Sequence, residues 1–305
     1  MVQRTDELIH LPDGTVLSAW LFLPEGPGPH PAITMAHGFG GTKYHHGMEA
    51  IARRIAEAGF AVSLHDHRGF GDSTGEPRQD IDPYRQIEDW RRVISHLQTL
   101  DPIDADRIGV WGTSYSGGHA LVLGATDRRI TAVYSQVPTI SGSQSSRRRV
   151  PPHLTRRLEQ AIAADELEQA RGGEPASQAF VSDDLTLPAS YRSTDAIDFY
   201  LRHNAPEGVW ENRVTVQSNR RARSYDPGHW IDQISPTPLM MLVGTHDTVA
   251  PTDLALSAYE RALEPKELVL LPGGHFDPYL DGFEASTGAA VRFFRTHLRT
   301  RVQAG

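Results

Sequence analysis

The heptapeptide GTSYSGG occupies residues 112–118 and follows directly on an apolar run at residues 107–111. A helix-compatible run, residues 119–123, comes after it. A strand, a glycine-framed serine and a helix together indicate a nucleophile elbow, the strained turn that exposes a serine hydroxyl above a sheet. Small residues must flank that serine so that the strand and the helix can approach each other. Ser114 is therefore the candidate nucleophile.

The elbow departs from the usual G-x-S-x-G pattern at one position. Gly112 satisfies the near side, whereas Ser116 stands on the far side and is followed by two glycines. A serine side chain is small enough to fit there, but its hydroxyl needs a hydrogen-bond partner. We interpret Ser116 as a tolerated variant. Because Gly and Ser are also common turn residues, the surrounding sequence must decide between an elbow and a plain loop.

Composition indicates an ordinary globular protein. The chain has 305 residues, 39% of them hydrophobic and 22% charged, enough for one large α/β domain with an insertion or for two small domains. The absence of cysteine excludes disulfides, thiolate metal sites and a cysteine nucleophile. A net charge of −8 gives no general attraction to nucleic acid or to an anionic membrane, and the first residues lack the apolar core of a signal peptide. We therefore expect a cytoplasmic enzyme, with neither nucleic acid nor membrane as a partner.

Short β-branched runs alternate with longer helix-like segments through most of the chain, which is typical of a mostly parallel sheet with helices on both faces. Strands are predicted at residues 15–23, 31–36, 60–64, 107–111, 130–135, 238–243 and 267–271, and helices at residues 48–58 and 83–100. From about residue 139 to residue 235 the chain is polar, arginine-rich and helix-prone, and the alternation resumes after it. The sequence therefore predicts a doubly wound α/β core domain, residues 1–138 and 236–305, with a helical lid inserted at residues 139–235.

A serine hydroxyl is a poor nucleophile at neutral pH and needs a histidine base that is oriented by a carboxylate. In this architecture such groups follow the carboxyl ends of strands, in the chain order serine, acid, histidine. Asp247 follows the predicted strand at residues 238–243, and His275 follows the one at residues 267–271. We predict a triad of Ser114, Asp247 and His275. The alternatives are that Asp247 is a turn or helix-cap residue and that His275 is one structural histidine among 15.

The charge that develops on a substrate carbonyl oxygen requires backbone N–H donors aimed at it. One donor is expected from the residue after the nucleophile, Tyr115, and the other from the loop HGFGGT at residues 37–42, where we assign Phe39. A glycine-rich loop also suits phosphate, but the chain has neither of the glycine motifs that bind it. The histidines at residues 45–46 and 65–67 lack a metal-ligand spacing, so we expect neither a metal nor a cofactor.

Five motifs of the chain carry a resemblance to a known family. They lie at residues 37–43, 66–73, 112–118, 244–247 and 274–279. Together they resemble the serine hydrolases of the α/β-hydrolase superfamily. Within it the chain is similar to the branch of dienelactone-hydrolase-like and acetylxylan-esterase-like enzymes and polyketide-transferase-type hydrolases. The resemblance spans nearly the whole chain except the insertion, and it implies the same three triad residues and a helical lid over the pocket.

From these residues we expect a serine esterase that hydrolyses a small-molecule carboxylic ester, with a methyl ester or a lactone of a secondary metabolite among the candidates. An acyltransferase is the alternative, because both reactions share the acyl-enzyme. A peptidase and a non-catalytic ligand-binding protein rank lower. In the lid, Tyr191 and Trp210 are the expected substrate contacts, with the lid's own small core as the alternative place for each. Homodimerisation is the default expectation.

Overall fold

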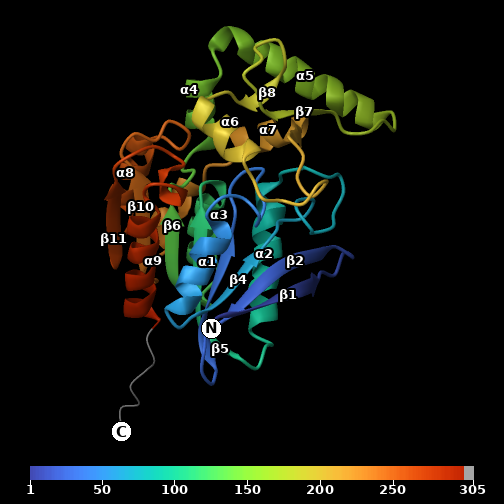
Figure 1. The fold of residues 1–305 in the computed structure, drawn as a ribbon. Helices are drawn as coiled ribbons and strands as arrows, with labels where there is room; N and C mark the ends of the chain where they lie inside the picture. The colour runs from blue at the N-terminus through green and yellow to red at the C-terminus, as the bar shows by residue number, and fades with distance from the viewer. Residues whose placement is uncertain (299–305) are drawn as a thin grey trace.

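Two sheets organise residues 1–298, which the computed structural model describes (Figure 1). The larger sheet contains β1 (Gln3–His10), β2 (Val16–Leu23), β3 (His30–Ala36), β4 (Ala61–His65), β5 (Ile103–Thr113), β6 (Ile130–Gln136), β10 (Leu239–Gly244) and β11 (Lys266–Leu271). Their order is β1-β2-β4-β3-β5-β6-β10-β11. β2 is antiparallel to both of its neighbours, and every other pair in this sheet is parallel. The predicted mostly parallel α/β architecture is confirmed.

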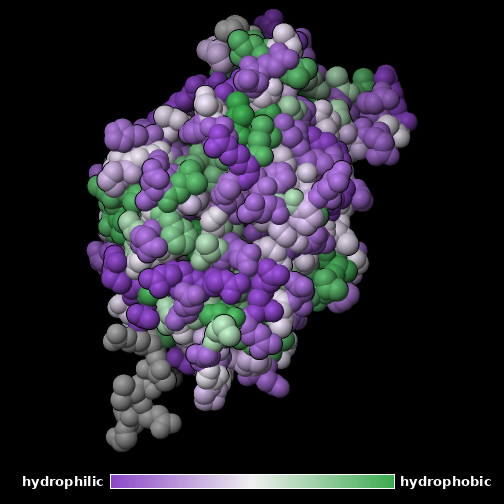
Figure 2. Space-filling model, in the orientation of Figure 1, coloured by the Kyte–Doolittle hydropathy of each residue, from purple (hydrophilic) through white to green (hydrophobic). Residues whose placement is uncertain are grey.

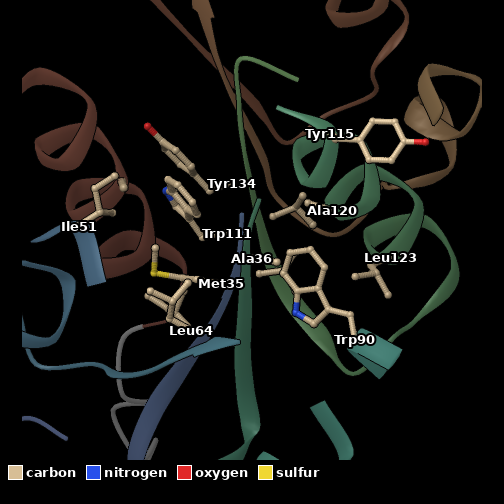
Figure 3. Close-up of a cluster of buried hydrophobic side chains, with 14 of the residues drawn as sticks. Met35, Ala36, Ile51, Leu64, Trp90, Trp111, Tyr115, Ala120, Leu123 and Tyr134 are labelled. Carbon is tan, nitrogen blue, oxygen red and sulfur yellow. The ribbon is translucent and has the colours of Figure 1, made fainter. Parts of the chain in front are cut away.

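Helices cover both faces of the larger sheet. They are α1 (Met48–Glu57), α2 (Pro83–Leu97), α3 (Tyr115–Thr126), α8 (Thr252–Arg261) and α9 (Phe283–His297). α1 packs against α9, and α2 packs against α3. Figure 3 shows the two resulting layers, with Met35 and Trp111 on one side of the strands and Trp90 and Leu123 on the other, all of them buried. Because both faces are covered, the side chains of the central strands are buried on both faces of the sheet.

α2 illustrates how local sequence sets an element. The carboxylate of Asp82 accepts the N–H groups of Tyr84 and Arg85 at 3.1 and 3.3 Å, and Pro83 occupies the first turn. Both features favour helix initiation at this point. The indole N–H of Trp90 then donates to Thr34 Oγ1 at 2.8 Å, which anchors the helix to β3.

One strand of the larger sheet, β1, is not predicted from the sequence. It lies at the edge of the sheet, and most of its side chains are exposed or half-buried, so its sequence QRTDELIH is largely polar. Hydrophobic periodicity does not mark such a strand. Its pairing with β2, whose side chains are mostly buried, brings it into the sheet.

The chain leaves the larger sheet after Gln136 and returns to it at Leu239. Between them lie α4 (Gly142–Arg149), α5 (Pro152–Ala170), β7 (Ser177–Val181), β8 (Ala189–Tyr191), α6 (Thr194–Leu201), β9 (Arg213–Thr215), α7 (Val216–Arg223) and the 3-10 helix η1 (Pro227–Gln233). The three strands form a second sheet in the order β8-β7-β9. The expectation that residues 139–235 are helical is therefore wrong in part, because strands of three to five residues are too short for a periodic signal.

In Figure 1 this connecting segment, with its helices and small sheet, lies across one end of the larger sheet. Phe180, Tyr200 and Trp210 of this segment are buried and belong to the same hydrophobic cluster as the strands of the larger sheet. The face in Figure 2 is mostly hydrophilic, with hydrophobic residues in small separate groups. Among residues 1–298, no helix combines the length and the apolar character needed to cross a bilayer.

Candidate active site

Ser114 stands at the turn between β5 and α3, with a φ of 57° and a ψ of −115°. A positive φ is costly for a residue that carries a Cβ, so the surroundings must enforce it. The N–H of Ser114 donates to Gln136 O at 2.8 Å, and its carbonyl oxygen accepts the N–H of Thr139 at 2.8 Å. The strand and the helix approach so closely that a Cβ on Gly112 would lie 2.0 Å from Ser116 O. Only glycine fits at residue 112, as the elbow pattern predicts.

One chain of hydrogen bonds connects the three predicted side chains. His275 Nε2 lies 2.8 Å from Ser114 Oγ, and His275 Nδ1 lies 2.7 Å from Asp247 Oδ2. Asp247 Oδ1 accepts the N–H groups of Val249 and Ala250 at 2.9 and 2.8 Å. A carboxylate only accepts, so His275 carries its proton on Nδ1 and its Nε2 accepts the serine hydroxyl. This arrangement can remove a proton from Ser114 Oγ.

The topology of the sheet explains why these side chains meet. β10 and β11 are parallel neighbours with Gly244 opposite Leu271, so the loops that follow them start side by side. The Asp277 carboxylate accepts the N–H of Gly274 at 2.5 Å and tightens the turn just before the histidine. The three side chains are covered: Ser114 is 7% exposed, Asp247 5% and His275 2%.

The loop at residues 37–42 passes directly beside the elbow. β3 and β5 are neighbours with Ala36 opposite Gly112, which brings the two following turns together. A Cβ on Gly38 would lie 2.9 Å from the Cβ of Ser114. The glycine in this loop thus allows a close approach of its backbone to the serine.

Two backbone N–H groups beside Ser114 have no acceptor among residues 1–298. The N–H of Phe39 donates to no backbone group of residues 1–298, and the N–H of Tyr115, the first residue of α3, has no acceptor within the helix. The two rings pack edge to face at a centroid distance of 5.1 Å, which keeps the two residues together. These are the two N–H groups that the sequence analysis assigns to an oxyanion.

The connecting segment binds the carbonyl groups of this loop. Trp210, one of the two expected substrate contacts, is 8% exposed, and its indole N–H donates to Gly40 O at 2.8 Å. The hydroxyl of Tyr200 donates to Phe39 O at 3.1 Å. Trp210 therefore binds the loop at residues 37–42. Its ring packs against that of His45, with the two ring centroids 5.3 Å apart.

Tyr191, the other expected contact, is half-buried at the end of β8. Its ring centroid lies 6.0 Å from that of Phe39 and 5.5 Å from that of Phe180. The guanidinium of Arg149 lies 5.0 Å from the centroid of the same ring. The structure therefore brings Tyr191 next to the loop, with an exposed cation beside it.

Four buried histidines form a group behind the elbow that the sequence does not predict. They are His37, His65, His67 and His119. Burial lowers the pKa of His65 and of His119 to about 3, and it also lowers the pKa values of His37 and His67, so the rings are neutral at physiological pH. They come from distant parts of the chain, and their spacing in the sequence does not predict that they lie together. Within the described residues, no three His, Asp or Glu side chains form a group that could hold a metal ion.

Comparison with known proteins identifies the family of this chain. Residues 13–277 match the profile of the X-Pro dipeptidyl-peptidase (S15 family). The quorum-quenching protein AidA of Acinetobacter baumannii is 32% identical over 283 residues, which cover 91% of this chain and 90% of that protein. Thiohydrolase aneE of Aspergillus aculeatus is 29% identical over 295 residues, 92% of this chain and 89% of its own.

A third relative has a known structure. The polyketide transferase grgF of a Penicillium species is 31% identical over 97% of both chains. The crystal structure of the α/β hydrolase GrgF from Penicillium sp. sh18 has a TM-score of 0.86 at 29% identity, and the match covers 98% of this chain and 100% of that one. The chain therefore belongs to the α/β-hydrolase superfamily, in the X-Pro dipeptidyl-peptidase (S15) family and in the branch that includes polyketide transferases and thiohydrolases.

Proposed function

We propose that this protein is a serine hydrolase that cleaves a carboxylic ester or thioester through an acyl-enzyme on Ser114. The observation that carries the proposal is the hydrogen-bond chain from Asp247 through His275 to Ser114, with distances of 2.7 and 2.8 Å, at a strained strand-to-helix turn. A nucleophile, a base and a group that orients the base are together what acyl transfer requires.

The reaction has two halves. Ser114 Oγ attacks the carbonyl carbon while His275 Nε2 takes the hydroxyl proton, and Asp247 stabilises the imidazolium. The N–H groups of Phe39 and Tyr115 donate to the carbonyl oxygen as it becomes negative. Collapse of the tetrahedral intermediate expels the alcohol or thiol, which receives the proton from His275. Water then attacks the acyl-enzyme by the same route and releases the acid.

The surroundings of the histidine favour a neutral, partly apolar acyl group. The ring of Phe276 lies 5.0 Å from that of His275 and stacks on Phe199 at 4.6 Å. Both oxygens of Asp247 are engaged, one by His275 and the other by two backbone N–H groups, so this carboxylate is not free to bind the amine of a peptide. The names of the thiohydrolase and polyketide transferase relatives point to acyl substrates as well.

We further propose that residues 139–235 act as a lid. The hydrogen bonds from Trp210 to Gly40 O and from Tyr200 to Phe39 O support this role, because they fasten the segment onto the loop beside Ser114. His275 is only 2% exposed, which is consistent with a segment that moves to admit the substrate.

Transfer of the acyl group to an alcohol is the second candidate. The relative named a polyketide transferase favours this reading. Both outcomes share the steps that precede deacylation.

A product assay separates these possibilities. The wild-type enzyme is incubated with an ester and with the thioester of the same acid, each with and without an added alcohol, and the products are identified by mass spectrometry. Free acid in every reaction supports hydrolysis, and a new ester that replaces the acid supports transfer. A folded protein that produces neither with any acyl chain tested contradicts the proposed function.

A further inference from the structure

The hydroxyl of Ser116 joins the first turn of α3 to the loop that carries Phe39. Ser116 Oγ lies 2.5 Å from the carbonyl oxygen of His37 and 2.9 Å from Nε2 of His67. Ser116 and both histidines are buried, with exposed fractions of 1 to 2%. A glycine, the usual elbow residue at this position, would make neither hydrogen bond.

The direction of each bond follows from the groups involved. A carbonyl oxygen only accepts, so the single hydroxyl proton of Ser116 goes to His37 O. Ser116 Oγ then accepts from His67, whose Nε2 carries the proton. The backbone N–H of His67 donates to Nε2 of His37 at 3.3 Å, so His37 carries its proton on Nδ1. Burial lowers the pKa of both histidines, which leaves one proton on each ring.

His37 donates this Nδ1 proton to the peptide that follows. Its Nδ1 lies 2.9 Å from Gly38 O, which also accepts the N–H of Gly41 at 3.2 Å. The C=O of Gly38 and the N–H of Phe39 belong to one planar trans peptide and point in opposite directions. Holding the carbonyl of Gly38 therefore aims the N–H of Phe39.

We propose that Ser116 is a positioning residue for the oxyanion hole: it fixes the carbonyl of His37 directly and the ring of His37 through His67, and thereby keeps the N–H of Phe39 aimed at the substrate oxygen. This inference rests on the proposed function, which gives that N–H its role. The loop contains three glycines, at residues 38, 40 and 41, and glycine has the most backbone freedom to lose on ordering. The hydrogen bonds of Ser116, which lies outside the loop, limit this freedom.

Ser116→Ala tests the proposal, because it removes the hydroxyl and leaves Ser114, Asp247 and His275 in place. We expect kcat for a p-nitrophenyl ester to fall about tenfold with KM changed less than about twofold, since the oxyanion contact strengthens in the transition state. This loss is smaller than the roughly 10²- to 10³-fold loss from deleting a donor outright. Affinity for a trifluoromethyl ketone, which Ser114 converts to a tetrahedral adduct with a negative oxygen, should fall by a similar factor.

Ser135 provides the matched control. It is fully buried, and its Oγ donates to the carbonyl oxygen of Gly117 in α3 at 2.9 Å and not to that of His37. Ser135→Ala therefore removes a bond of the same kind, and we expect kcat and ketone affinity close to those of the wild type. If Ser116→Ala matches Ser135→Ala within twofold in both measurements, the positioning role is wrong.

A second variant distinguishes a loss of activity from a loss of folded protein. Ser116→Gly restores the usual elbow residue. Phosphonate titration of Ser114 counts the intact active sites in each preparation, and kcat per intact site should fall by the same factor as in Ser116→Ala. Full activity per titrated site in either Ser116 variant overturns the inference alone. A wild-type protein that neither cleaves any ester nor binds the ketone overturns the proposed function, and the inference falls with it.

Discussion

Gly38 and Ser114 approach so closely that a methyl group on the glycine would stand 2.9 Å from the Cβ of the serine. The register of β3 and β5, with Ala36 opposite Gly112, creates this proximity. The loop that carries Phe39 and the turn that carries the nucleophile are therefore in van der Waals contact. A larger side chain in the loop must displace either the loop or Ser114.

We predict that Gly38→Ala lowers kcat by about 10- to 100-fold, because the new methyl group must displace the loop and with it an oxyanion donor. The matched control is Gly288→Ala in α9, where the nearest neighbour of the added Cβ is the end of the Arg292 side chain at 3.6 Å. Ester hydrolysis by both variants provides the measurement. Unchanged kcat in Gly38→Ala would show that the loop does not need this close approach.

The hydrogen bonds between the connecting segment and the loop at residues 37–42 give a second prediction. Trp210→Phe removes the donor to Gly40 O, and Tyr200→Phe removes the donor to Phe39 O. Each loss should destabilise the fold by about 1 kcal/mol and speed amide hydrogen exchange in the loop at residues 37–42. Exchange is followed by mass spectrometry. Wild-type exchange rates in both variants would contradict the proposed lid contacts.

A buried histidine predicts how stability depends on pH. Burial lowers the pKa of His119 to about 3 from a usual 6.5, and the ring lies 2.8 Å from the hydroxyl of Tyr225. Between these pH values the unfolded chain binds a proton that the folded protein excludes, so folding stability is fully present above pH 6.5 and decreases as the pH falls. The contribution of this group amounts to about 1.4 kcal/mol per pH unit over the window.

His119→Gln should therefore reduce the loss of stability between pH 5.5 and pH 4.5 by about 1 kcal/mol, measured by urea unfolding. Tyr225→Phe is the control, because it removes the hydrogen-bond partner but no titrating imidazole, and it should keep the wild-type dependence on pH. An identical pH dependence in His119→Gln and wild type would mean that His119 takes up its proton without penalty in the folded state.

Lys43 gives a prediction about stability. Its side chain is fully buried, with Nζ 2.5 Å from Asp66 Oδ2 and 2.6 Å from Asp72 Oδ2. Lys43→Met leaves the buried carboxylate of Asp66 without its cation and should cost about 3–5 kcal/mol of unfolding free energy. The double variant with Asp66→Asn should lose less than the sum of the two single losses. Additive losses in urea unfolding would show that the two groups do not interact.

The elements that the sequence predicts are those whose burial leaves a pattern. The central strands and the helices α1 and α2 appear near their predicted residues, and Ser114, Asp247 and His275 follow predicted strands in the expected order. The polar edge strand β1 and the short strands of the second sheet leave no such pattern. Local periodicity reports which face of an element is buried, and it contains no information about short or exposed elements.

The partner of Ser116 illustrates the other limit. The need for a partner follows from the buried hydroxyl alone, but His67 lies 49 positions away and the carbonyl of His37 lies 79 positions away. Only the pairing of β3 with both β4 and β5 brings these three residues together. The role of Trp210 likewise depends on how the connecting segment folds back onto the loop, which composition does not encode.

The most direct test of the account is the hydrolysis of p-nitrophenyl esters by the wild type and by Ser114→Ala, with a serine-directed phosphonate as an active-site label. The assignment of Ser114 as the nucleophile predicts that the wild type turns over and is labelled, and that the variant is not labelled and loses roughly 10⁴- to 10⁶-fold in kcat, because the three side chains act as a unit. Wild-type turnover by purified Ser114→Ala would contradict it.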